Sequence, residues 1–101
     1  MAEPTPDRDL DRMAAYFRML ADPSRLAILR SMIANGELSV GQAAAETGHS
    51  QANASKHLKV MAAAGVLSRR KDGLRVFYRL ADPAVERVFR LVSDIVRGGD
   101  R

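Results

Sequence analysis

This 101-residue sequence contains no cysteine and no tryptophan, and aromatic residues make up only 5% of it. Without cysteine, the chain has no disulfides, no thiolate metal site and no thiol for redox chemistry or catalysis. No apolar run approaches the ~20 residues that a transmembrane helix needs. Residues 1–12 are polar and acidic, unlike the apolar stretch of a signal peptide. We therefore expect a cytoplasmic protein without a membrane partner.

The usual signs of an enzyme are missing as well. The sequence shows no glycine-rich phosphate loop and no paired carboxylates with a credible pocket, so neither catalysis nor a cofactor is expected. A metal site needs several converging ligands, and the two histidines, His49 and His57, stand eight residues apart. We interpret His49 as a turn residue and His57 as a packing or phosphate-facing residue, with no metal site.

Positive charge is concentrated in one stretch of the chain. The whole chain carries a net charge of +4, whereas residues 50–80 hold seven Lys or Arg against a single acid, Asp72, a local excess of six. Each phosphate that such cations contact releases condensed counterions, which provides affinity for nucleic acid of any sequence. Short polar side chains on one helix can then read base edges. The segregated charge predicts a double-stranded DNA partner.

Apolar periodicity and turn residues predict the order of the structural elements. We expect helices at 8–20, 23–34, 40–47, 51–64 and 83–97, and strands at 66–71 and 74–80. Asp72-Gly73 is the expected two-residue hairpin turn. This order is mostly α with a β-hairpin wing, a winged helix-turn-helix with an extra helix at each end. Residues 1–7 are predicted to be a flexible arm, 8–97 the domain and 98–101 a disordered tail.

Capping residues mark the predicted helix starts. Asp22 and Asp82 each precede a proline, which suits the first position of a helix. Ser39 and Gln42 match a capping box, and Ser50 is positioned to cap the fourth helix. The second helix is expected to bury Leu26, Leu29, Met32 and Ile33.

Several motifs, in order along residues 10–97, resemble those of the ArsR/SmtB family of small bacterial winged-helix repressors. They are Leu20–Leu29, Gly36–Val40, Ser50-Gln51, Ser55–Val60, Ala64–Leu67, Arg69–Gly73 and Tyr78–Leu80. The resemblance implies a homodimer held by the first and last helices, with the fourth helix in the major groove of a palindromic operator. It also implies that the hairpin lies on the phosphate backbone. In such families an inducer typically weakens DNA binding, and no motif here identifies one.

The resemblance does not extend to the family's metal ligands. Ser39 and Gly41 stand where metal-responsive members carry cysteines. Asp82 matches one ligand position of the last helix, but Ala84 replaces its histidine partner, and Asp82 is better explained as a helix cap. We therefore expect a repressor without a Cys- or His-based metal site.

Residues at the start of the fourth helix are the predicted base readers, because that end of a recognition helix enters the groove. Gln51 and Asn53 carry paired donors and acceptors that suit adenine, while lysines suit phosphate. The alternative is capping and a solvated polar face, and Ser50 is assigned first to capping. Arg79 stays open. The predicted DNA-binding residues are Ser50, Gln51, Asn53, Ser55, Lys56, His57, Lys59, Arg70, Lys71 and Arg75.

The last helix has more apolar residues than one packed face needs, which is consistent with a dimer. The predicted dimer-interface residues are Leu10, Met13, Phe17, Val88, Leu91, Val92 and Ile95. Two other functions remain open. One is the same repressor with a non-thiol inducer, an apolar molecule or an oxyanion, between the end helices. The other is a protein-binding dimerisation module that has lost its DNA contacts.

Overall fold

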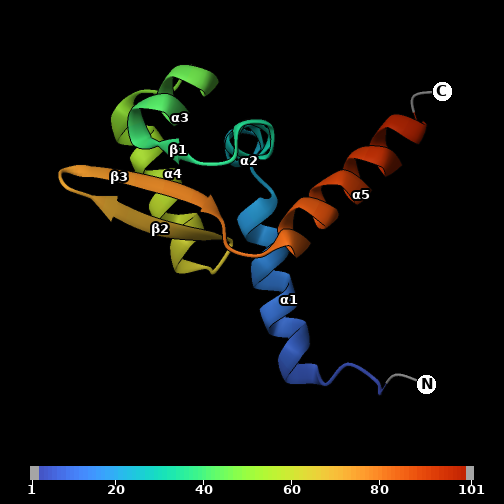
Figure 1. Cartoon of the computed structure of the whole chain (residues 1–101). Helices are drawn as coiled ribbons and strands as arrows, with labels where there is room; N and C mark the ends of the chain where they lie inside the picture. Colours follow the sequence, from blue (N-terminus) through green and yellow to red (C-terminus); the bar gives the residue numbers. More distant parts are fainter. Residues whose placement is uncertain (1–2, 100–101) are drawn as a thin grey trace.

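The computed structural model describes residues 3–99, and within them it has five helices and three strands (Figure 1). In chain order these are α1 (Asp7–Leu20), α2 (Pro23–Asn35), β1 (Leu38–Ser39), α3 (Val40–Thr47), α4 (Gln51–Ala63), β2 (Leu67–Asp72), β3 (Arg75–Leu80) and α5 (Pro83–Gly99). This is the predicted winged helix-turn-helix order with one added strand, β1. None of the helices within 3–99 has the length and apolar character needed to cross a bilayer.

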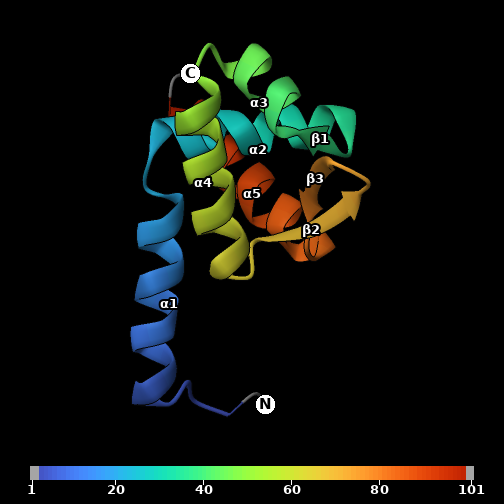
Figure 2. The same ribbon diagram turned by 90° about the vertical axis from the view of Figure 1, so that its left-hand side faces the viewer.

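The core lies where α2, α3 and α4 meet the sheet. Ile28 of α2, Leu58 of α4 and Tyr78 of β3 are among its largest fully buried side chains. Helix α4 buries apolar residues at helical spacing, which leaves its opposite face to solvent. Helix α1, in contrast, has no buried residue and extends away from this group of helices in both views (Figures 1 and 2).

The predicted helix caps are confirmed. The carboxylate of Asp22 accepts two backbone N–H groups of α2, at 2.8 and 3.3 Å. Ser39 and Gln42 form a reciprocal capping box, in which each side chain accepts the other residue's backbone N–H, at 3.1 and 2.8 Å. Asp82 accepts a backbone N–H of α5 at 2.8 Å. These local bonds satisfy N–H groups that a helix start otherwise leaves without partners.

A short third strand was absent from the expected order. Strand β1 pairs with β3 in antiparallel fashion, with Leu38 opposite Tyr78 and Ser39 opposite Phe77, so the sheet order is β1-β3-β2. Two residues are too few to show strand alternation, and no sequence pattern predicts the pairing. Its consequence is that the middle of β3 is hydrogen-bonded to the segment that leads into α3.

The hairpin turn lies one residue later than predicted. Asp72 pairs with Arg75 across β2 and β3, so the two loop residues are Gly73 and Leu74. Gly73 has φ +62°, and a two-residue turn with a positive φ at its first position favours glycine there. Asp72 therefore stays in the strand ladder, and Leu74 lies fully exposed at the tip of the wing.

Four expectations about the helices also need correction. Leu26 is 38% exposed rather than buried, because it lines an open groove beside α5, and Ile33 is only half-buried. Helix α5 continues past Arg97 to Gly99, so two residues of the predicted tail are helical. Residues 1–2 and 100–101 of the predicted arm and tail lie outside the described residues. Asp7, the last residue of the predicted arm, is the first residue of α1. The division into arm, domain and tail otherwise stays a prediction.

Candidate nucleic-acid interface

Helix α4 presents its polar residues to solvent from its first turn. The Ser50 hydroxyl accepts the backbone N–H of Asn53 at 3.1 Å, which confirms the predicted cap. Gln51 and Asn53 are exposed, as are the two lysines of α4, while Ser55 is half-buried. Side chains buried on the opposite face anchor α4 to the core. The exposed polar and cationic row is therefore fixed in direction by packing beneath it.

The wing carries its cations on both of its faces. Alternate residues of a strand point to opposite sides, so Arg70 and Arg75 share one face with Phe77, whereas Lys71 lies on the other. The guanidinium carbons of Arg70 and Arg75 lie 4.6 and 5.0 Å from the centre of the Phe77 ring. Cation–π contact of this kind orders long side chains without neutralising them. The hairpin therefore carries exposed cations on both of its faces, and these include Arg70, Lys71 and Arg75.

Arg70 has an acidic partner that sequence reasoning missed. Its guanidinium donates two hydrogen bonds to Glu37, at 2.6 and 3.2 Å, and lies 3.8 Å from Asp72. This hydrogen bonding and the charge of Arg70 lower the pKa of the Glu37 carboxyl, and Glu37 in turn raises the pKa of Arg70. The two residues stand 33 positions apart, so no local pattern links them. A DNA phosphate would have to compete with Glu37 for Arg70.

His57 of α4 is held by Arg25 of α2. The Nε of Arg25 donates to Nδ1 of His57 at 3.2 Å, so only Nε2 of the ring is left for another partner. The His49 ring lies 5.8 Å away, centroid to centroid. Burial alone would raise the pKa of Asp22, but its two backbone hydrogen bonds and the charge of Arg25 lower it. Among the described residues there is no group of three or more side chains positioned to hold a metal ion.

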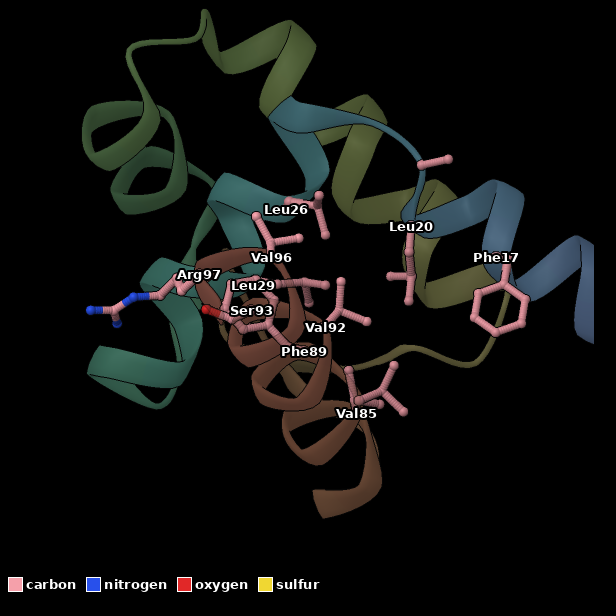
Figure 3. A pocket seen from close by; sticks show the side chains of 12 residues that line it. Phe17, Leu20, Leu26, Leu29, Val85, Phe89, Val92, Ser93, Val96 and Arg97 are labelled. Carbon is pink, nitrogen blue, oxygen red and sulfur yellow. The ribbon is translucent and has the colours of Figure 1, made fainter. Parts of the chain in front are cut away.

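A second surface, formed by α1 and α5, is apolar. Predicted dimer residues on it are widely exposed, with Phe17 at 58%, Leu91 at 62% and Ile95 at 66%, although Val88 is half-buried. Between these helices and α2 lies a groove of about 380 Å³ with an almost wholly apolar lining. Figure 3 shows its α1 and α5 side chains facing one hollow, while the Arg97 head group points away from it. The apolar surface exceeds the scattered exposure that is normal for a monomer.

Comparison with known proteins places this geometry in a family. Residues 20–70 match the helix-turn-helix domain family. The chain is 37% identical to the transcriptional regulator KmtR of Mycobacterium tuberculosis over 93% of its own length and 69% of that protein. It is 36% identical to the transcriptional repressor SmtB homolog of Synechocystis, over 88% of this chain and 67% of that protein. The chain belongs to the ArsR/SmtB family of helix-turn-helix regulators.

A solved structure supports the same assignment. A winged helix-turn-helix DNA-binding domain from Mycobacterium bovis, a homodimer described as a possible ArsR-family regulator, superposes with a TM-score of 0.80. It is 33% identical and covers 96% of this chain and 91% of its own. In this ArsR/SmtB member, α4 thus occupies the place of the second helix of a helix-turn-helix, and β2–β3 that of the wing.

Proposed function

We propose that this ArsR/SmtB member is a homodimeric repressor that binds a palindromic double-stranded operator in the cytoplasm. The observation that carries the proposal is the separation of two surfaces. Exposed polar and cationic side chains gather on α4 and the wing, whereas exposed apolar side chains gather on α1 and α5. The first surface suits DNA and the second suits another copy of the chain.

In this proposal α4 enters the major groove, and Gln51 and Asn53 read base edges there. The lysines Lys56, Lys59 and Lys71, together with Arg75, contact phosphates. Ser50 acts mainly as the cap, and Ser55 and His57, being half-buried, reach DNA only at the edge of the interface. Arg70 contributes only after release from Glu37. The protein acts by occupying promoter DNA and not by catalysis.

Two substitutions separate base reading from phosphate contact. The probes are a duplex that the wild-type protein selects from a random pool and a scrambled duplex of equal length. Gln51→Ala should cost about 1–3 kcal/mol on the selected duplex and little on the scrambled one. Lys56→Ala should weaken binding to both duplexes and lower the slope of log affinity against log salt by about one.

Fluorescence anisotropy at several salt concentrations measures both effects, and sedimentation velocity reports the dimer. Arg90→Ala, an exposed site on α5, is the matched control and should change neither property. If Gln51→Ala lowers affinity equally for the selected and the scrambled duplex, Gln51 does not read a base. A wild-type protein that binds neither duplex at any salt would refute the proposed function.

A further inference from the structure

Arg25 joins the helix of the apolar surface to the helix of the DNA surface. Its Nη1 donates to the backbone carbonyl of Met19 in the last turn of α1 at 3.2 Å, and lies 3.5 Å from the Met19 sulfur. Its Nε donates to Nδ1 of His57, in the middle of α4, at 3.2 Å. One half-buried guanidinium thus contacts α1 and α4 together, although it belongs to α2.

The position of Arg25 in its own helix is electrostatically unfavourable. It lies in the first turn of α2, directly after Pro23 and Ser24, where the helix dipole favours acids and disfavours cations. The start of α2 is already capped by Asp22. Helix formation therefore does not explain an arginine here, and its side-chain contacts to α1 and α4 do.

The chemistry of both contacts makes them directional. A guanidinium is planar, and its N–H groups point in fixed directions, so the two bonds constrain the helices more than a flexible ammonium would. The Met19 carbonyl is among the last of α1, which have no partner within the helix. On His57, the bond assigns the ring proton to Nε2, because an accepting Nδ1 carries none. That leaves Nε2–H as the donor of the ring for another partner.

Small changes in this link have large effects at a distance. Helix α1 has 14 residues and is therefore ~21 Å long at 1.5 Å per residue. A tilt of about 10° about its Met19 end moves the other end by roughly 3.6 Å, close to the ~3.4 Å rise of one base pair. In a dimer held through α1, such a tilt would change the separation of the two α4 helices.

We infer that Arg25 is a positioning residue that sets which half-site spacing the dimer accepts, by fixing α1 through Met19 relative to α4 through His57. The inference rests on the proposed function, because spacing has meaning only for a dimer on a palindrome. Dimeric helix-turn-helix proteins bind half-sites about 10–10.5 base pairs apart, one helical turn. Arg25 itself needs no contact with DNA for this role.

The test compares three duplexes: the one that the wild type selects, the same duplex with one base pair inserted between the half-sites, and a single half-site. Wild-type protein should bind the inserted duplex at least about tenfold more weakly. Arg25→Met keeps the aliphatic stem but loses both links. It should bind the selected duplex about fivefold more weakly or worse, lose much of the penalty for the insertion, and bind the single half-site as the wild type does.

Two further variants control for charge and for folding. Arg30→Met removes an exposed arginine of the same helix and should leave the preference for spacing unchanged. His57→Asn keeps an acceptor near the position of Nδ1 and should keep the preference, whereas His57→Leu should lose it. This second pair decides the matter if Arg25→Met does not fold, as judged by circular dichroism and thermal melting.

Two results would overturn the inference. The first is that Arg25→Met retains the full wild-type penalty for the inserted duplex, while the wild type itself dimerises and prefers the selected duplex. If Arg25→Met is unfolded, the same result for His57→Leu counts instead. That result would refute the role of Arg25 in spacing but would not contradict the proposed function. A wild-type protein that is monomeric, or that binds all three duplexes equally, refutes the proposed function and the inference with it.

Discussion

The basic side chains of this protein differ in what they already contact. Arg25 and Arg70 donate hydrogen bonds to protein acceptors, whereas Lys56, Lys59 and Lys71 are exposed. A cation that must leave an acidic partner gains less from a phosphate, because the partner's attraction is lost on transfer. At the scale of single residues, phosphate affinity should therefore come mainly from the lysines, and Arg70 should mainly hold β2 to Glu37.

This difference predicts how stability depends on pH. The pKa of the Glu37 carboxyl is lowered by its hydrogen bond with Arg70 and by the charge of Arg70. Between the lowered folded value and the usual ~4.3 of an unfolded chain, the unfolded state binds more protons. The stability that the pair supplies is therefore present above about pH 4.3 and is lost as pH falls through the folded value. Glu37→Gln should make the free energy of unfolding depend less steeply on pH in this acidic range.

Urea unfolding at a series of pH values from neutral to acid measures the effect. Arg70→Gln is the matched variant, since it removes the cause of the lowered pKa while leaving the carboxyl in place, and it should reduce the same pH dependence. The double variant should add nothing further. Parallel profiles for the wild type and Glu37→Gln would show that the pair makes no contribution to folding.

The side-chain bonds that could be predicted from the sequence are those whose partners are close along the chain. The capping box of Ser39 and Gln42 and the cap by Ser50 each close over three positions, so their chemistry is visible in a short window. The pairs formed by Arg70 and Arg25 span 33 and 32 positions. Only the folded chain brings such residues together, and neither pair has a sequence signature.

At the scale of elements, helix starts depend on partners close along the chain, whereas strand ends depend on distant ones. Helix starts were predictable because capping side chains fix them locally. Strand β1 exists only because β3 lies beside it, and the hairpin turn shifted by one residue because pairing placed Asp72 opposite Arg75. Strand ends depend on distant partners, so propensity alone places them less accurately.

The wing turn yields a prediction at this scale. Gly73 has φ +62° with open space around it, so backbone strain and not a clash opposes substitution. Gly73→Val should cost about 1–2 kcal/mol of hairpin stability, because a side chain disfavours positive φ. Asn tolerates this region better, so Gly73→Asn should cost less. The core lies elsewhere, and the helices should keep their structure.

Amide hydrogen exchange of β2 and β3 measures the local opening of the hairpin, and anisotropy measures DNA affinity. Gly73→Val should show faster exchange in both strands and weaker binding to selected and scrambled duplexes alike, since the wing is proposed to contact backbone. Gly73→Asn should show exchange rates and DNA affinities between those of Gly73→Val and the wild type. Unchanged DNA affinity despite an opened hairpin would exclude the wing from the interface.

At the scale of the whole molecule, the fold places two kinds of surface on separate helices. The recognition helix α4 is anchored by the core, whereas α1 has no buried residue and α5 has only Val85. Specific protein interfaces bury about 1,200–2,000 Å² in total, and the exposed apolar side chains of α1 and α5 supply a surface of that character. We expect dimerisation to stabilise these helices and to set the geometry for DNA.

Leu91 offers the sharpest test of that expectation. It is 62% exposed, so Leu91→Glu should fold as a single copy with little loss of secondary structure. In a dimer, the new carboxylate would be buried without a partner, at a cost of several kcal/mol. Sedimentation should therefore show monomers, with strongly reduced affinity for the palindromic duplex and wild-type affinity for a single half-site.

The matched controls for Leu91→Glu lie on the same helix. Arg87→Ala changes an exposed polar site and should leave the dimer intact. Val85→Glu places a carboxylate at a site only 5% exposed and should destabilise the monomer itself, seen as a lower melting temperature. Because these outcomes differ, loss of palindrome binding can be traced to lost dimerisation and not to unfolding. If the Leu91→Glu protein still sediments as a dimer, the dimer interface does not include this part of α5.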